Sequence, residues 1–232
     1  MKRLCALVLG GLFATSPVFA DDRHPVVVEL FTSQGCSSCP PADAVLHDLA
    51  SRDDVLPLAL HVDYWDYIGW KDQFAKPSHT NRQKAYAHVG GRNMIYTPQM
   101  VVQGQEDVVG VKAMKLAELI EKHRNAPVLV DLDVSRVGSE VTVDLQAVAP
   151  LEDPMVVQLV RYAPLREVEI TRGELAGHNL SYANVVESMD ALGTWDGEGT
   201  ASLSFELTGD LPAAILVQRA GFGPIMVAAR ID

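Results

Sequence analysis

The sequence predicts an α/β unit followed by an antiparallel, β-sandwich-like unit, and three observations support this fold class. Strand-like and helix-like patterns alternate through residues 25–124. A proline-containing break at 125–127 then ends the alternation. Beyond it, short segments of alternating apolar and polar residues are separated by Gly, Pro and Asp, as is typical of a β-sandwich. We therefore place a boundary near residue 126, between domains at 21–126 and 127–232.

The first 20 residues have the features of a secretory signal sequence. Lys2 and Arg3 precede an apolar stretch that is too short to span a membrane, and small residues follow up to Ala20. We expect cleavage after Ala20, which would remove Cys5 and leave only two cysteines. The prediction is a secreted protein without a permanent membrane anchor, an uncleaved anchor being the alternative.

The chain is acidic, with 30 Asp and Glu against 19 Lys and Arg and a formal net charge of −11 at pH 7. A nucleic-acid backbone requires a basic surface, so nucleic-acid binding is excluded. A strong net charge favours a soluble protein, and we expect a monomer. The sequence also lacks a phosphate loop, a dinucleotide fingerprint and a nucleophile elbow.

The elements of the first unit follow in chain order. An apolar run at 26–31 predicts a strand that is buried on both faces. A helix then begins near Ser38, with Pro40 and Pro41 tolerated in its first turn because those positions need no amide. The remaining predicted elements are a strand at 55–62, a helix at 80–89, a hairpin of 100–104 and 108–110, and an amphipathic helix at 111–124.

The second unit is predicted to consist mainly of strands. Alternation predicts strands at 130–134, 141–145 and 203–207, and further strands near 155–162, 213–219 and 225–230. Only residues 181–192 interrupt this series, as a possible helix.

Cys36 and Cys39 form a C-x-x-C between the first strand and the first helix, which is a strong redox signal. A bridge between them closes a very small loop and contributes little stability, which favours chemistry over architecture. The free amides and dipole of the helix N-terminus favour a thiolate at Cys36, so Cys36 is predicted to attack and Cys39 to resolve the mixed disulfide. This disulfide would itself be the redox group, with no bound cofactor.

Other interpretations of the two thiols remain open. They could be a buried, inert pair, since apolar surroundings raise the pKa of a thiol. Together with His61 they could also hold Cu(I), a soft ion suited to thiolates. Because the chain has no second C-x-x-C and no paired-histidine motif, we expect no metal. A third alternative is a non-catalytic envelope protein whose β-rich unit binds a partner.

Three stretches carry a resemblance to known proteins: 29–43 around the dithiol, 61–70, and 96–100 with its Thr97-Pro98. The order of elements resembles the thioredoxin fold, in which a cis-proline loop faces the dithiol. More narrowly, the stretches look like a family of secreted bacterial proteins catalogued as domain of unknown function 1223. The resemblance implies a thioredoxin-like first domain and export to the periplasm.

The resemblance also implies roles for individual residues. Cys36 matches the nucleophile, Cys39 the resolving thiol and Pro98 the cis-proline, and Thr97 would offer its backbone to an extended substrate. Two departures stand out. Two serines separate the thiols in place of Gly-Pro, and Gly35 replaces the tryptophan that precedes the dithiol in thioredoxins.

Glu29 is an ionisable residue within an apolar strand. A buried carboxylate beneath the dithiol could accept the proton of Cys39. The alternative is a structural hydrogen-bond acceptor, or an acid at a strand end that reaches water.

The connection at 63–78 is rich in aromatic residues and follows a strand whose end should lie beside the dithiol. Tyr64, Trp65 and Trp70, together with Gln99, are candidates for binding a peptide substrate. Ordinary packing of a long loop is the alternative.

The function that the sequence predicts is that of a secreted thiol–disulfide oxidoreductase. Its partners would be proteins that carry thiols or disulfides, and a second redox protein would exchange electrons with it.

Overall fold

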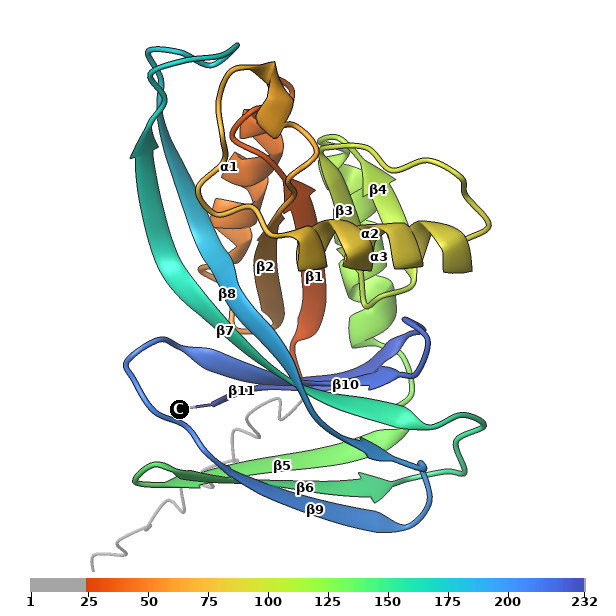
Figure 1. The fold of residues 1–232 in the computed structure, drawn as a ribbon. Coiled ribbons are helices and arrows are strands. Elements are labelled where there is room, and N and C mark those ends of the chain that lie inside the picture. Colours follow the sequence, from red (N-terminus) through yellow and green to blue (C-terminus); the bar gives the residue numbers. More distant parts are fainter. Residues whose placement is uncertain (1–23, 232) are drawn as a thin grey trace, which may run out of the picture.

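The structure is a computed structural model that describes residues 24–231. The predicted signal sequence and its cleavage after Ala20 lie outside these residues. The described chain is a mixed α/β structure that consists mostly of strands and has few helices (Figure 1). Within residues 24–231, no helix is long and apolar enough to cross a membrane.

The elements of the first half are β1 (Val26–Thr32), α1 (Pro40–Leu49), β2 (Val55–His61), η1 (Asp66–Ile68), α2 (Pro77–Val89), β3 (Gln99–Val102), β4 (Glu106–Val109) and α3 (Ala113–Arg124). Those of the second half are β5 (Val130–Val137), β6 (Glu140–Ala147), β7 (Met155–Glu169), β8 (Asn179–Trp195), β9 (Thr200–Glu206), β10 (Ala213–Arg219) and β11 (Ile225–Ile231).

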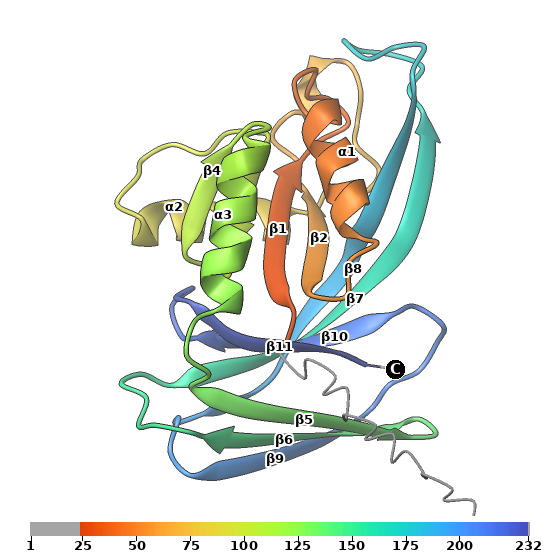
Figure 2. The same ribbon diagram turned by 180° about the vertical axis from the view of Figure 1, so that it is seen from behind.

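One sheet runs through both halves of the chain. Its strand order is β11-β10-β7-β8-β2-β1-β3-β4, and β5-β6-β9 form a separate three-stranded sheet. In the first half, β1 runs parallel to β2 and antiparallel to β3. Helices α1 and α3 cover one face of these strands and α2 covers the other (Figures 1 and 2). Every residue of β1 is therefore buried, which explains its unbroken apolar run.

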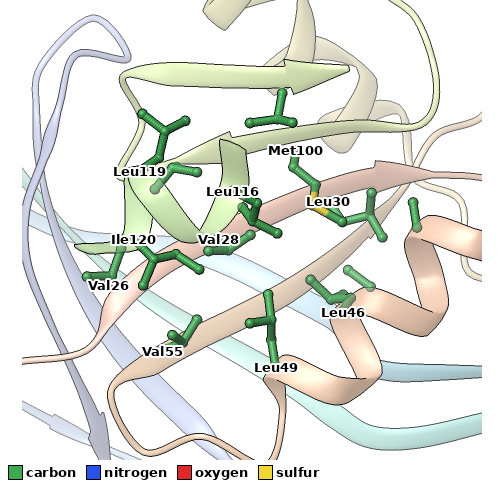
Figure 3. Packing of buried hydrophobic residues seen from close by; sticks show 14 of the residues in the cluster. Val26, Val28, Leu30, Leu46, Leu49, Val55, Met100, Leu116, Leu119 and Ile120 are labelled. Atoms are coloured by element: carbon green, nitrogen blue, oxygen red, sulfur yellow. The ribbon is translucent and has the colours of Figure 1, made fainter. Parts of the chain in front are cut away.

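The core between β1 and the helices is built from alternate residues of the strand. Val28 and Leu30 point toward α1 and α3, where they meet Leu46 and Leu116 (Figure 3). Val27 and Phe31 point to the opposite face, into the cluster that contains Tyr86 of α2. Full burial of one large aliphatic side chain stabilises a fold by about 1.5–3 kcal/mol, so these alternating contacts fix how α1 sits on β1.

A second core lies between the two sheets. Val143 and Leu145 of β6 pack in one cluster with Met155, Ile215 and Val217 of the large sheet. The three-stranded sheet therefore covers the part of the large sheet formed by the second half (Figure 1).

The possible helix at 181–192 is wrong, because this segment belongs to strand β8. β8 pairs with β7 along most of its length, but the register shifts near Val157 and again near Arg161. Bulges of this kind interrupt the alternation of apolar and polar residues that identifies a strand in a sequence. Residues 182–186 are moreover all buried, so this part of β8 has no polar face.

The β7–β8 hairpin connects the two halves in space. β8 pairs in parallel with β2 at Ala59 and Val185, so the sheet continues from one half into the other. The distal part of the hairpin, residues 163–184, extends beside α1 (Figures 1 and 2). We call this part the arm.

Candidate functional site

Cys36 and Cys39 form a disulfide between the end of β1 and the start of α1, with an S–S distance of 2.08 Å. The carbonyl oxygen of Cys39 accepts hydrogen bonds from the amides of Ala42 at 2.8 Å and Asp43 at 3.1 Å. Cys39 thus begins the hydrogen bonding of α1. The bridge is nearly enclosed, since Cys36 is 4% exposed and Cys39 is 0% exposed.

Thr97 and Pro98 lie at the same end of the sheet as the dithiol. The β1–β3 register pairs Phe31 with Gln99, so the residues before Gln99 lie opposite those that follow Phe31. The peptide bond between Thr97 and Pro98 is cis. The side chain of Gln99 is buried and accepts a hydrogen bond from Gln83 at 2.8 Å, which holds it inside the protein.

The aromatic connection at 63–78 contacts the segment that precedes the dithiol and also the Thr97–Pro98 loop. The indole N–H of Trp65 donates to Oγ1 of Thr97 at 2.7 Å. The indole N–H of Trp70 donates to Oε1 of Gln34 at 2.7 Å. Tyr64 donates its hydroxyl hydrogen to Gln83 at 3.2 Å. The structure thus brings Trp70 to the segment before the dithiol and Trp65 to the Thr97–Pro98 loop, while Tyr64 bonds both α2 and Thr97.

Glu29 lies on the α2 face of the sheet. Arg82 donates to its two carboxylate oxygens at 2.6 and 3.2 Å, and the Tyr86 hydroxyl donates to it at 2.6 Å. Burial raises the pKa of Tyr86 well above its ordinary value, so its hydroxyl keeps the hydrogen that it donates. Gln218 of β10 donates to the same hydroxyl at 3.0 Å. Glu29 and Arg82 thus form a buried ion pair. The hydroxyl of Tyr86 connects this pair to Gln218 and so to the second half of the chain.

A second buried acid is Asp43, a residue of α1 that the sequence did not single out. It lies one helical turn after Cys39, and its Oδ1 accepts a hydrogen bond from Thr32 at 2.7 Å. Burial raises the pKa of the Asp43 carboxyl to about 7, although the Thr32 hydrogen bond and the charge of His61 oppose this shift. Residues one turn apart on a helix have Cβ atoms about 5–6 Å apart, which places this carboxyl beside the resolving cysteine.

Further polar side chains surround Asp43. Nδ1 of His61 and Oδ2 of Asp72 are 2.7 Å apart, with both side chains fully buried. The ring of Tyr182, from β8, lies 4.7 Å from the His61 ring. Nε2 of His61 and the hydroxyl of Tyr182 are buried and have no hydrogen-bond partner among the described residues. The arm therefore contributes a side chain to this polar cluster.

A cavity of about 360 Å³ lies between α1 and the arm, and Pro40, Asp43 and Tyr182 line it. Asp43 thus lies at the edge of a space that is open to solvent. Nowhere in residues 24–231 do three or more His, Cys, Asp or Glu side chains form a group that could hold a metal ion.

The chain is similar to a solved structure over almost its whole length. This is the crystal structure of protein AGR_C_4864 from Agrobacterium tumefaciens, which is 30% identical, with a TM-score of 0.77 over 91% of this chain and 96% of that one. A hypothetical protein, PH1083 from Pyrococcus horikoshii, is 10% identical and has a TM-score of only 0.23 over 49% of this chain and 99% of that one. A search of curated proteins found no match. A family profile described as "protein of unknown function (DUF1223)" matches residues 27–218, and the chain belongs to this family.

Proposed function

We propose that the protein is a thiol–disulfide oxidoreductase whose redox centre is the Cys36–Cys39 pair. The observation that carries the proposal is the disulfide at the junction of β1 and α1. These two cysteines are the only ones in residues 24–231, and their bridge joins neighbouring turns of chain instead of distant segments. A structural staple would close a longer loop, so exchange chemistry is the better explanation.

We assign the first half to the thioredoxin-like folds. Support comes from a strand, the dithiol, a helix and a parallel strand in succession, followed by α2, an antiparallel hairpin and α3. Helices on both faces of these strands support the same assignment (Figure 2). The Thr97–Pro98 loop at the dithiol end of the sheet would then receive the substrate chain through the backbone of Thr97.

The reaction begins from the reduced dithiol. The Cys36 thiolate attacks one sulfur of a substrate disulfide, that disulfide breaks, and the departing substrate sulfur takes a proton from water. Cys39 then loses its proton and attacks the sulfur of Cys36, which releases the second substrate thiol. Two electrons have moved to the substrate, and a dithiol partner protein restores the reduced state. In reverse, the same steps oxidise substrate thiols, and the reduction potential relative to the compartment sets the direction.

Asp43 is the group that would take the proton from Cys39. Its carboxyl lies one turn below Cys39, and its pKa of about 7 allows it to accept and release a proton near neutral pH. Glu29, which the sequence suggested for this role, lies on the other face of the sheet and is held by Arg82 and Tyr86. We therefore assign proton transfer to Asp43 and a structural role to Glu29.

The protein would be exported to the periplasm, act as a monomer without a bound cofactor, and exchange thiols with proteins. The apolar start of the sequence and the acidic composition support this context.

A trapping experiment tests the function. A Cys39→Ala variant retains the attacking thiol but cannot resolve the mixed disulfide, so it should accumulate covalent adducts with partner proteins. A Cys36→Ala variant is the matched control and should trap far fewer. The proposal fails if neither variant captures partners and if the reduced wild-type protein neither reduces insulin nor exchanges with glutathione.

A further inference from the structure

Cys36 has little access to solvent for a residue that must exchange with protein thiols. It is 4% exposed in the oxidised protein, and Cys39 is 0% exposed. Attack on a disulfide requires the incoming sulfur to reach a bridge sulfur directly. The site as it stands is closed to a thiol that is attached to a folded protein.

Trp65 and Ile68 lie against Gly35, the residue before Cys36. A Cβ atom at Gly35 would be 3.1 Å from Cβ of Trp65 and 3.4 Å from Cδ1 of Ile68. The first of these distances is shorter than most contacts of a real Cβ atom, and the second is an ordinary contact. The absence of a side chain at Gly35 therefore lets Trp65 rest directly on the backbone that precedes Cys36.

The same segment is tied to the opposite wall of the site. The indole N–H of Trp65 donates to Oγ1 of Thr97 at 2.7 Å. Trp65 thus spans the distance from the dithiol segment to the Thr97–Pro98 loop. The indole therefore lies against the residue whose backbone the proposed function assigns to the substrate chain.

The other end of the connection is fixed. Asp72 accepts a hydrogen bond from the amide of Gln34 at 2.8 Å, and Trp70 bonds the side chain of the same residue. Trp70 and Phe74 also pack against the apolar tip of the arm, which consists of Val168, Ile170 and Leu175. Gly69, with a φ of 100°, lies between the fixed and the overlying parts. A glycine there can absorb a change of backbone angle.

We propose that residues 65–68 form a gate over Cys36, closed by Trp65 against Gly35 and Thr97, which swings about Gly69 to admit a partner. The arm of the second half anchors the fixed end of this gate. The proposal names a regulation of the redox site and rests on the proposed function for its purpose. Closure of the gate can be measured as the rate at which a small thiol reduces the bridge, and this needs no physiological partner.

The test is the rate at which dithiothreitol reduces the Cys36–Cys39 bridge of the full mature chain, followed by alkylation and mass spectrometry. Trp65→Phe removes the indole donor, and Thr97→Val removes the acceptor with little change in shape. Each should raise the rate about two- to tenfold, the factor that corresponds to one net hydrogen bond. The double variant should be no faster than the faster single variant, because both changes remove one interaction.

Two further variants complete the design. Gly35→Ala should also raise the rate, because its methyl group would press against Trp65 from the other side. Tyr67→Phe is the matched control on the same segment, since Tyr67 is 79% exposed, and its rate should equal that of the wild type. The equilibrium with glutathione should be the same in all variants, because a gate changes access in both directions.

The gate is refuted if Trp65→Phe, Thr97→Val and Gly35→Ala all react at the wild-type rate. It is also refuted if the two hydrogen-bond variants act additively, or if the rates change only in proportion to the glutathione equilibrium. These outcomes differ from failure of the proposed function, which would appear as an absence of trapped partners while dithiothreitol still distinguishes the variants.

Discussion

Glu29 and Asp43 are two buried acids on opposite faces of one structure, and their partners give them opposite properties. Glu29 faces α2, where Arg82 and Tyr86 bind its carboxylate at hydrogen-bond distances. Asp43 belongs to α1 and points toward β1, where Thr32 is the one side chain among the described residues that donates a hydrogen bond to it, and burial raises its pKa to about 7. Burial alone therefore does not identify a group that exchanges protons. The presence or absence of a compensating cation separates the structural acid from the chemical one.

The largest effect should come from removing the cation that compensates the buried charge of Glu29. An Arg82→Met variant keeps the apolar part of the side chain but leaves the Glu29 carboxylate without its cation. Removing one partner of a buried ion pair costs about 3–5 kcal/mol, and urea unfolding should detect this loss. As a control, Arg52→Met breaks the partly exposed pair of Arg52 and Asp54 and should cost no more than about 1 kcal/mol. Equal losses in the two variants would contradict a structural role for the Glu29 pair.

The pH dependence of stability should identify Asp43. Its pKa is raised from 3.8 to about 7 in the folded protein, so the folded state binds this proton more tightly than the unfolded chain does. The resulting stability is fully present below pH 3.8 and is lost as the pH rises through about 7. The contribution is on the order of 4 kcal/mol, and an Asp43→Asn variant should lack it.

The readout is the free energy of unfolding measured from pH 4 to pH 8 for both proteins. The difference between them should grow with pH in favour of the variant. His61, Asp72, Thr32 and Tyr182 face Asp43 from the neighbouring elements and are unchanged in this comparison. A difference that does not vary with pH would mean that Asp43 does not titrate in this range.

Asp43→Asn should also slow the step in which Cys39 resolves the mixed disulfide. General acid–base catalysis contributes at least about a hundredfold, so a loss of this size is expected at pH 7. The deficit should shrink as the pH rises, because hydroxide can then take the proton in place of the carboxylate. Asp48→Asn, an exposed acid on the same helix, is the control for the change of charge. Stopped-flow release of a thiol from a preformed mixed disulfide measures the step, and a deficit that persists at high pH would indicate damage to the structure instead.

The smallest effects compare two buried tyrosines, one in each network. The Tyr86 hydroxyl contacts Glu29, Arg82 and Gln218, so Tyr86→Phe should cost about 1–3 kcal/mol of stability. The Tyr182 hydroxyl has no hydrogen-bond partner among the described residues, so Tyr182→Phe should change stability by less than about 1 kcal/mol. Thermal unfolding measures both, and a larger loss at Tyr182 would mean that its hydroxyl makes a strong interaction.

The sequence was most informative where a signal is local. The apolar run of β1, the C-x-x-C before a helix with two prolines, and the hairpin after Pro98 all depend on neighbouring residues. Family membership followed from the same local stretches and is confirmed over residues 27–218.

The sequence was least informative where partners are distant along the chain. Asp43 resembles an ordinary acid in the first turn of a helix, where the dipole favours it. Its burial depends on β1 and on Tyr182 of the arm, which the sequence does not place nearby. In the same way, only the folded chain pairs Glu29 with Arg82, and only the folded chain inserts β8 between β7 and β2.

The reduction potential of the Cys36–Cys39 bridge tests the central claim most directly. The mature chain would be equilibrated in glutathione buffers of graded potential, quenched and alkylated, and its reduced fraction measured by mass spectrometry. An exchange centre should show a reversible two-electron transition between about −120 and −270 mV, the range of thiol oxidoreductases. A bridge that stays oxidised below about −300 mV, as structural disulfides do, would contradict the account.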